Sequence, residues 1–295
     1  MSYVKAGTDA LGNDVKLFYQ DLGNSKADQT VVLIHGWPLS SCMWDYQLAE
    51  LPSHNIRVVA YDRRGFGKSS QPWSGYDYDT LTDDLKAVLD ELDLNNVTLV
   101  GFSMGGGEVA RYMSRYGGAR VSKVAFVSAV TPYLLKTDDN PDGVDQSVFD
   151  DILENLQKDR ADFLQTFGKQ FYGVNLLNRP VSQAHLDGDF ARAYVASYKA
   201  TIDCAKAFSS TDFRSDLTQI SVPALVIHGD SDKTVPIESS GELTANALPQ
   251  AQYIVYEGEP HGLFFTQKDR LNEDLIAFVK EGVAVNQQAQ TTTLY

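Results

Sequence analysis

Residues 97–109 have the sequence VTLVGFSMGGGEV, and this stretch decides the fold. Its first four residues form a mainly apolar run and predict a buried strand, whereas the residues from Gly105 onward predict the start of a helix. Between them lies Ser103, with a glycine two residues to either side. On a sharp turn from strand to helix, such a serine is pushed out of the end of a sheet with its hydroxyl exposed. We therefore predict that Ser103 is a nucleophile at the edge of a sheet.

Strands and helices alternate around this stretch. Besides the strand that precedes Ser103, apolar runs predict strands at residues 15–21, 31–34, 56–61, 123–128, 223–228 and 253–256. Most of these runs are separated by amphipathic segments, and strands that alternate with helices are joined by parallel crossovers. The sequence therefore predicts an α/β fold whose sheet is covered by helices on both faces.

The alternation breaks at Thr131-Pro132, after which the pattern is helical and rich in aromatic residues. We predict that residues 131–214 form a helical cap inserted over the carboxyl edge of the sheet, where it would supply apolar walls and exclude water. The α/β core would then be one discontinuous domain made of residues 1–130 and 215–282. Residues 283–295 are rich in Gln, Ala and Thr, and we expect a flexible tail there.

Composition excludes several classes of function. The 295 residues are 43% hydrophobic and 22% charged, which is typical of a globular protein. The net charge is −14 without a basic stretch, so nucleic acid and anionic membranes are not expected partners. Cys42 and Cys204 lie far apart and form no metal or redox spacing, so we expect free thiols. Free thiols and the absence of an apolar leader or a membrane-spanning stretch favour a cytoplasmic location.

Two local motifs lie between the predicted strands at residues 56–61 and 97–100. Residues 62–69, DRRGFGKS, invite a dinucleotide-binding interpretation, but the third glycine of G-x-G-x-x-G is missing and we reject it. Thr80 and Asp83 predict a capping box at the start of a helix.

A serine hydroxyl needs a base, and histidine suits this role because its pKa lies near neutrality. The chain offers five candidates: His35, His54, His185, His228 and His261. Of these, His261 lies in a Gly/Pro-rich loop after the last predicted strand, and such loops collect at the carboxyl edge that displays the serine. We therefore predict His261 as the base. A structural hydrogen bond is the expected role of His228.

The acid that orients the histidine should lie between serine and histidine in the chain. Asp230 and Asp232 both follow the penultimate strand. We choose Asp232 and keep Asp230 as the alternative, since a short carboxylate in a turn also bonds nearby backbone N–H groups.

Negative charge that develops on a carbonyl oxygen needs fixed donors. We expect one from the backbone N–H of Met104, which begins the helix and has the helix dipole behind it. The other is expected from the N–H of Trp37, because Pro38 has none. Trp37 and Met104 are thus the predicted oxyanion hole.

From about residue 15 to residue 279, the chain resembles the α/β-hydrolase superfamily. Within it, the sequence is most similar to the family of cofactor-free haloperoxidases, aryl esterases, perhydrolases and γ-lactamases. The motifs that carry the resemblance are HGWP (35–38), YDRRGFG (61–67), GFSMGGGEVARY (101–112), TDFR (211–214) and VIHGD (226–230). The resemblance implies a mostly parallel eight-stranded sheet with an inserted cap, and it implies the same triad of Ser103, Asp232 and His261. It also implies an oxyanion hole at Trp37 and Met104, and a homo-oligomer.

Pro38 sharpens the resemblance, because in this family a proline after the oxyanion-hole residue is associated with perhydrolase behaviour. Its ring restricts the preceding residue and could move the carbonyl of Trp37, which could then accept a hydrogen bond from hydrogen peroxide. Pro38 could equally be only a loop-shaping residue. No haem, vanadium or metal is required, and the sequence offers no ligand set for one.

These observations predict a serine hydrolase of small carboxylic esters that forms an acyl-enzyme and also makes peracids. An amidase or γ-lactamase with the same triad is the alternative. A silent hydrolase fold that serves as a small-molecule receptor is the rival from another class. Dehalogenases and epoxide hydrolases are disfavoured because they place an aspartate where Ser103 stands.

Overall fold

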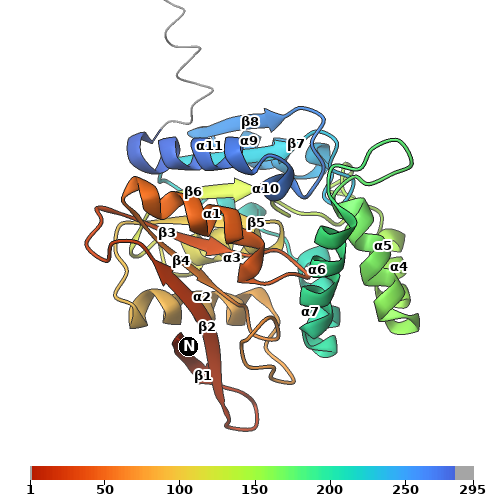
Figure 1. Ribbon diagram of the computed structural model, residues 1–295, viewed down its shortest axis with the longest axis horizontal. Helices are drawn as coiled ribbons and strands as arrows, with labels where there is room; N and C mark the ends of the chain where they lie inside the picture. The colour runs from red at the N-terminus through yellow and green to blue at the C-terminus, as the bar shows by residue number, and fades with distance from the viewer. Residues whose placement is uncertain (1, 283–295) are drawn as a thin grey trace, which may run out of the picture.

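The computed structural model describes residues 2–282, which form one eight-stranded sheet with helices on both faces (Figure 1). The strand order is β1-β2-β4-β3-β5-β6-β7-β8. All neighbours from β4 to β8 are parallel, and β2 pairs antiparallel with both β1 and β4. The strands are β1 (Ser2–Thr8), β2 (Asp14–Leu22), β3 (Gln29–Ile34), β4 (Ile56–Tyr61), β5 (Val97–Phe102), β6 (Val121–Val127), β7 (Ala224–Gly229) and β8 (Ala251–Tyr256). The predicted α/β fold with a mostly parallel eight-stranded sheet is confirmed.

Five helices lie in the chain between β6 and β7, and the first four of them, α4 to α7, fall within the predicted insertion. Figure 1 shows them, in green, beyond the carboxyl ends of the parallel strands. The α-helices are α1 (Asp45–Glu50), α2 (Tyr78–Glu91), α3 (Met104–Arg115), α4 (Gln146–Lys158), α5 (Arg160–Phe171), α6 (Gln183–Val195), α7 (Tyr198–Ser210), α8 (Arg214–Leu217), α9 (Gly241–Ala247), α10 (Leu263–Thr266) and α11 (Lys268–Glu281). Short 3₁₀ helices are η1 (Ser41–Trp44), η2 (Leu51–His54) and η3 (Ile237–Ser239). The predicted tail, residues 283–295, lies outside the described residues.

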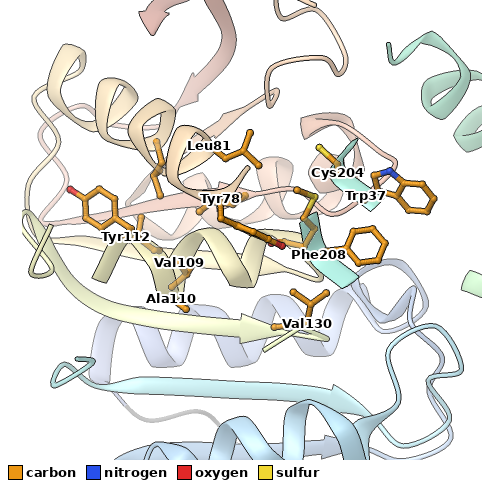
Figure 2. Close-up of a cluster of buried hydrophobic side chains, with 14 of the residues drawn as sticks. Trp37, Tyr78, Leu81, Val109, Ala110, Tyr112, Val130, Cys204 and Phe208 are labelled. Atoms are coloured by element: carbon orange, nitrogen blue, oxygen red, sulfur yellow. The ribbon is translucent and has the colours of Figure 1, made fainter. Parts of the chain in front are cut away.

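The parallel strands are apolar at nearly every position because both faces of the sheet are buried. In β3, Val32 and Ile34 join a core that includes side chains of α2 and α3, whereas Val31 and Leu33 join a second core under α1 and α11. The first core continues past the sheet, where Phe208 of α7 lies beside Trp37 (Figure 2). Helices α4 and α7 therefore share the first core with the sheet, whereas side chains of α5 and α6 join the second.

The first strand was not anticipated from the sequence. Residues 2–8, SYVKAGT, show no regular alternation of polar and apolar side chains, and of this strand only Val4 is fully buried. β1 lies at the edge of the sheet and pairs with β2 alone. An edge strand with one covered face needs few apolar residues, so its sequence carries little signal.

Cys42 and Cys204 are both free thiols, as predicted. Cys204 is fully buried in α7, and burial raises the pKa of its thiol to about 12. None of the helices formed by residues 2–282 combines the length and the apolar composition that crossing a membrane requires.

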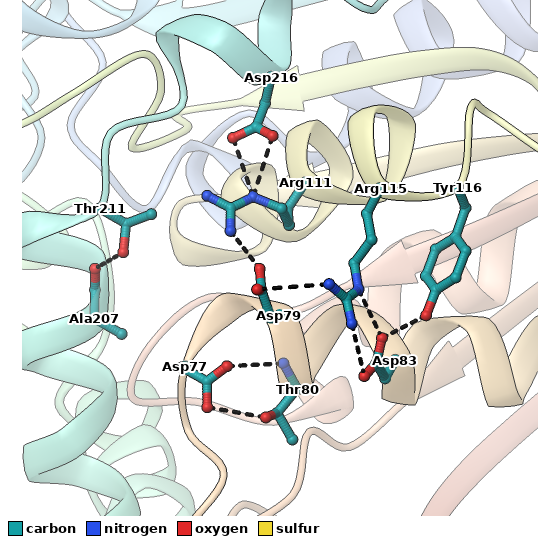
Figure 3. A network of polar contacts seen from close by, with 10 residues as sticks. All are labelled: Asp77, Asp79, Thr80, Asp83, Arg111, Arg115, Tyr116, Ala207, Thr211 and Asp216. Atoms are coloured by element: carbon teal, nitrogen blue, oxygen red, sulfur yellow. Dashed lines mark hydrogen bonds and ion pairs between the residues drawn. The ribbon is translucent and has the colours of Figure 1, made fainter.

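The predicted capping box at Thr80 is wrong by one turn. Helix α2 begins at Tyr78, and its N-cap is Asp77, whose carboxylate accepts hydrogen bonds from the Thr80 N–H and hydroxyl (Figure 3). Asp83, the other member of the predicted box, instead binds Arg115 of α3. The motif was misplaced because a carboxylate and a threonine are both good N-caps and lie within one turn of each other.

The Asp77 cap gives a test of this local structure. Asp77→Ala is expected to lower the free energy of unfolding by about 1 kcal/mol at pH 7, as measured by urea titration. Burial would raise the pKa of Asp77, but hydrogen bonds from Thr80 outweigh burial and hold it below its usual value. The stabilisation is therefore present above about pH 4 and shrinks as the pH falls through the folded-state pKa. Thr80→Ala is the control, and an equal or larger loss in that variant would contradict the cap.

Candidate active site

Ser103 joins β5 to α3 in a strained backbone conformation, with φ 52° and ψ −119°. The strain is held by hydrogen bonds on both sides of the residue. Its N–H donates to the carbonyl of Val127 at 3.0 Å, and its carbonyl accepts from the N–H groups of Gly106 and Val130. Gly105 allows α3 to approach β3, because a Cβ there would lie 2.6 Å from the carbonyl oxygen of Ile34. The turn predicted from the sequence is therefore present, and backbone contacts over-determine it.

Ser103, His261 and Asp232 lie in one hydrogen-bonded series. The Oγ of Ser103 is 3.0 Å from Nε2 of His261, and Nδ1 of His261 is 2.6 Å from Oδ2 of Asp232. All three come from loops at the carboxyl ends of strands β5, β7 and β8. Each side chain is buried, with Ser103 6% and His261 1% exposed. The structure thus brings together the three residues that the sequence singled out, in the geometry of a nucleophile, a base and an orienting acid.

The carboxylate of Asp232 is held ionised. Burial would raise its pKa, but the charge of His261 and hydrogen bonds from His228 and His261 outweigh burial and place the pKa far below its usual value. Its other oxygen, Oδ1, accepts from the N–H groups of Thr234 and Val235, both at 2.8 Å. A fixed negative charge beside Nδ1 favours the tautomer whose Nε2 can accept a proton from the serine.

Asp230, the alternative acid, points elsewhere. Its Oδ1 accepts from the N–H of Gly258 at 2.7 Å, and the side chain is exposed. This is the turn-stabilising role that short carboxylates commonly have.

Aromatic rings hold the His261 imidazole from two sides. The ring centroid lies 4.9 Å from that of Phe102 and 4.8 Å from that of Phe171. Phe171 ends helix α5, and its carbonyl also accepts from the N–H of Gly262 at 2.8 Å. One of the inserted helices therefore packs directly on the candidate base, a contact that the sequence did not reveal.

The N–H group of Trp37 belongs to the loop after β3, and that of Met104 belongs to helix α3; both the loop and the helix lie beside Ser103. Met104 is the first residue of α3, and Trp37 follows β3 in a loop without regular structure. Neither N–H donates a hydrogen bond to any group of residues 2–282. The loop approaches the serine closely because Gly36 has no side chain: a Cβ there would lie 2.6 Å from Cδ1 of Phe102 and 3.1 Å from Cβ of Ser103.

The remaining histidines have structural contacts. His54 pairs with Glu50 on the surface, and His185 stacks on Phe265. His228 contacts the carbonyl of Val235 at 2.9 Å, as expected, but it also lies 3.3 Å from Oδ2 of Asp232. The sequence analysis missed this second contact, although a histidine four residues before the acid, across a tight turn, was a signal for it.

A cavity of about 410 Å³ opens onto Ser103. Helices α4, α5 and α7 and the loop after β7 supply most of its walls. Its apolar lining is Trp37, Val130, Leu134, Val144, Val148, Phe149, Ile152, Phe163, Phe167, Phe208, Val235 and Pro236, and polar side chains such as Asn155, Gln170 and Lys233 also face it. The volume suits a small organic ligand that is mostly apolar.

Pro38 does not line this cavity. It borders a separate space of about 20 Å³ with Leu39, Leu164 and Phe171, and the Trp37–Pro38 peptide bond is cis. Pro38 can therefore influence chemistry at Ser103 only indirectly, through the backbone of Trp37 or through Phe171, which packs on His261. Within residues 2–282, no group of three or more His, Cys, Asp or Glu side chains could hold a metal ion.

Three comparisons place the chain among known proteins. A model of the alpha/beta hydrolase fold family matches residues 29–268. The chain is 42% identical over 275 residues to a non-heme chloroperoxidase of Streptomyces lividans, covering 93% of this chain and 99% of that one. It is 41% identical over 267 residues to a bifunctional esterase/perhydrolase of Acinetobacter calcoaceticus, covering 90% and 96%. The crystal structure of a bromoperoxidase from Bacillus anthracis matches with a TM-score of 0.90 and 47% identity, covering 95% of this chain and 99% of that one.

Gly36 provides a test of the site's geometry. Gly36→Ala is expected to displace the loop that carries Trp37 and to lower kcat for a short aryl acetate by about 10²-fold, because a shift of about 1 Å in a catalytic group has that effect. The matched control is Gly168→Ala in α5, where an added Cβ meets nothing within 4 Å. If both variants kept the parent kcat, the close approach of Gly36 to Ser103 would have no catalytic importance.

Proposed function

Because the chain belongs to the alpha/beta hydrolase family, we propose that it is a serine hydrolase of small carboxylic esters that works through an acyl-enzyme. The observation that carries the proposal is the hydrogen-bonded series from Ser103 through His261 to the ionised Asp232. The activities of the two relatives, chloroperoxidase and esterase/perhydrolase, agree with it. The apolar cavity beside Ser103 has room for a small ester.

In the first half of the reaction, Oγ of Ser103 attacks the carbonyl carbon of the ester while Nε2 of His261 takes the hydroxyl proton. The carbonyl electron pair moves to the oxygen, and the N–H groups of Trp37 and Met104 donate to that oxyanion. Asp232 stabilises the imidazolium. When the tetrahedral intermediate collapses, the alcohol leaves with the proton from Nε2, and the acyl group stays on Ser103.

In the second half, the same imidazole removes a proton from the incoming nucleophile. Water gives the carboxylic acid, and hydrogen peroxide gives the peracid, with Ser103 regaining its proton in both cases. Halide oxidation would then be a reaction of the released peracid, so the protein itself needs no redox group. Pro38 is proposed to favour peroxide by setting the position of the Trp37 carbonyl, which would accept a hydrogen bond from it.

We propose that residues 131–214 act as the cap of this site and residues 1–130 with 215–282 as its core. The contact of Phe171 with the His261 ring and the walls that α4, α5 and α7 give the cavity support this division. A cap of this kind excludes water from the reacting centre and shapes the acyl pocket.

The triad would serve a lactam as well as an ester, and no contact of the cavity favours the lactam. The ester is preferred because the relative from Acinetobacter calcoaceticus is an esterase/perhydrolase. A cytoplasmic location and a homo-oligomer stay part of the proposal, the first supported by the two free thiols and the second by the family resemblance alone.

Replacing the nucleophile tests the proposal directly. Ser103→Ala is expected to lower kcat/KM for a short aryl acetate by on the order of 10⁴-fold or more. Ser128→Ala is the control, since this serine directly follows β6 at the same sheet edge and its buried hydroxyl has no partner among the described residues. An aryl phosphonate should label the parent at Ser103, as read by mass spectrometry. Residual activity within tenfold of the parent in Ser103→Ala, or an unlabelled parent, would reject the proposal.

The role of Pro38 is tested by a ratio. Pro38→Leu is expected to lower peracid formation relative to acid formation, measured at one peroxide concentration with the same acetate ester. Because both products come from one acyl-enzyme, the ratio is independent of how much folded enzyme is present. An unchanged ratio would show that Pro38 only shapes the loop.

A further inference from the structure

A fully buried ion pair lies beneath the two oxyanion donors. The Nε of Arg63 donates to Oε1 of Glu108 at 2.6 Å, and the exposed fractions of these side chains are 1% and 0%. The other carboxylate oxygen of Glu108 accepts from the hydroxyl of Tyr61 at 2.7 Å. The mechanism uses none of these groups. A buried ion pair is weak evidence for stability, since desolvation of the two charges offsets their attraction.

The pair joins the two elements that carry the donors. Glu108 is on α3, four residues after Met104 and so on the same side of the helix. On the other side, Nη2 of Arg63 donates to the carbonyl of His35 at 2.6 Å, where the loop that contains Trp37 begins. This loop has no regular structure of its own, so its position depends on such contacts.

His35 continues the connection to Trp37. The backbone N–H of Arg63 donates to Nε2 of His35 at 2.9 Å, so Nε2 carries no proton and Nδ1 does. Nδ1 then donates to the carbonyl of Gly36 at 2.9 Å. Burial and the charge of Arg63 both lower the pKa of His35, which keeps the ring neutral and able to accept.

The carbonyl of Gly36 and the N–H of Trp37 belong to one planar trans peptide group and point in opposite directions. Anchoring the carbonyl therefore aims the N–H. The contacts run without a break from α3 through Glu108, Arg63 and His35 to this peptide.

From this geometry we propose that Arg63 and Glu108 are positioning residues, which set the distance and direction between the N–H groups of Trp37 and Met104. The inference rests on the proposed serine hydrolase function, because it concerns the oxyanion hole of that reaction. A donor aimed at the oxyanion stabilises the transition state more than the bound ester. Loss of the alignment should thus lower kcat and leave KM nearly unchanged.

The chain offers a matched control in the next residue. Arg64 makes a bidentate pair with Asp84, both bonds at 2.6 Å, and these side chains are 6% and 2% exposed. This pair leads to α2 and not to the oxyanion loop. The same substitution at two adjacent, buried and paired arginines therefore separates positioning from folding.

The experiment compares Arg63→Lys with Arg64→Lys. Lysine keeps the charge but cannot donate to Glu108 and to the His35 carbonyl in the fork geometry of arginine. We expect Arg63→Lys to lower kcat for a short aryl acetate by about 10²-fold. KM should stay within about threefold, and the inhibition constant of phenylboronic acid, which forms a tetrahedral adduct with the serine, should rise with the loss in kcat. Arg64→Lys should lower the melting temperature and keep kcat and boronate affinity within about threefold of the parent.

A second pair of variants decides the question if Arg63→Lys does not fold. Tyr61→Phe removes the hydroxyl bond to Glu108, and Tyr256→Phe removes an equivalent buried bond, to Asp274 at 2.7 Å, between β8 and α11. Only the first should lower kcat and boronate affinity, by about threefold to tenfold. Equal kcat and boronate affinity within either pair of variants would overturn the inference. Failure of the proposed function is distinguishable, since the parent itself would then neither hydrolyse the ester nor react with the phosphonate.

Discussion

The strained backbone at Ser103 is the constraint on which the site depends. A residue at φ 52° and ψ −119° persists only where its surroundings hold it, and here hydrogen bonds to Val127 and Val130 tie it to β6 and the loop that follows. The strain lifts the hydroxyl out of the sheet edge toward His261. Because parallel strands end at the same edge, the loops after β7 and β8 deliver the acid and the base to the same place.

The charged groups around Ser103 differ between the side of His261 and the side of the proposed oxyanion hole. Asp232 is held ionised next to His261, so in the proposed mechanism the imidazolium would meet a charge already in place. The proposed oxyanion donors are neutral N–H groups, and the nearby charges of Arg63 and Glu108 compensate each other. The inserted helices add apolar walls and one direct contact, Phe171 on the His261 ring. The lowered pKa of Asp232 contributes stability above the usual carboxyl pKa, and that contribution is lost as the pH falls.

Patterns in the sequence anticipated the strands buried on both faces, because such strands are continuously apolar, and they anticipated the inserted helices. They did not anticipate β1, whose edge position demands little apolar surface, or the N-cap of α2, where two good capping residues compete. Of the five histidines, His261 was chosen from its loop and His228 was interpreted as structural. The contact of His228 with Asp232 spans only four residues and was overlooked, whereas the buried position of His35 depends on Arg63, 28 residues away in the sequence.

The sequence by itself determined the fold class and two members of the candidate triad, Ser103 and His261, and it favoured Asp232 over Asp230 as the third. A serine between glycines and the ends of apolar runs are local signals that topology places at one edge of the sheet. Only the tertiary structure decided between Asp230 and Asp232 as the partner of His261. Both residues lie in one loop, and only the folded chain shows that the carboxylate of Asp232 contacts His261 whereas that of Asp230 contacts Gly258. The tertiary structure alone also brought Arg63 into contact with His35, 28 residues away in the sequence, and with Glu108, 45 residues away. Contacts of this kind arise from packing of separate elements, and they cannot be predicted from the hydrophobic periodicity of the sequence.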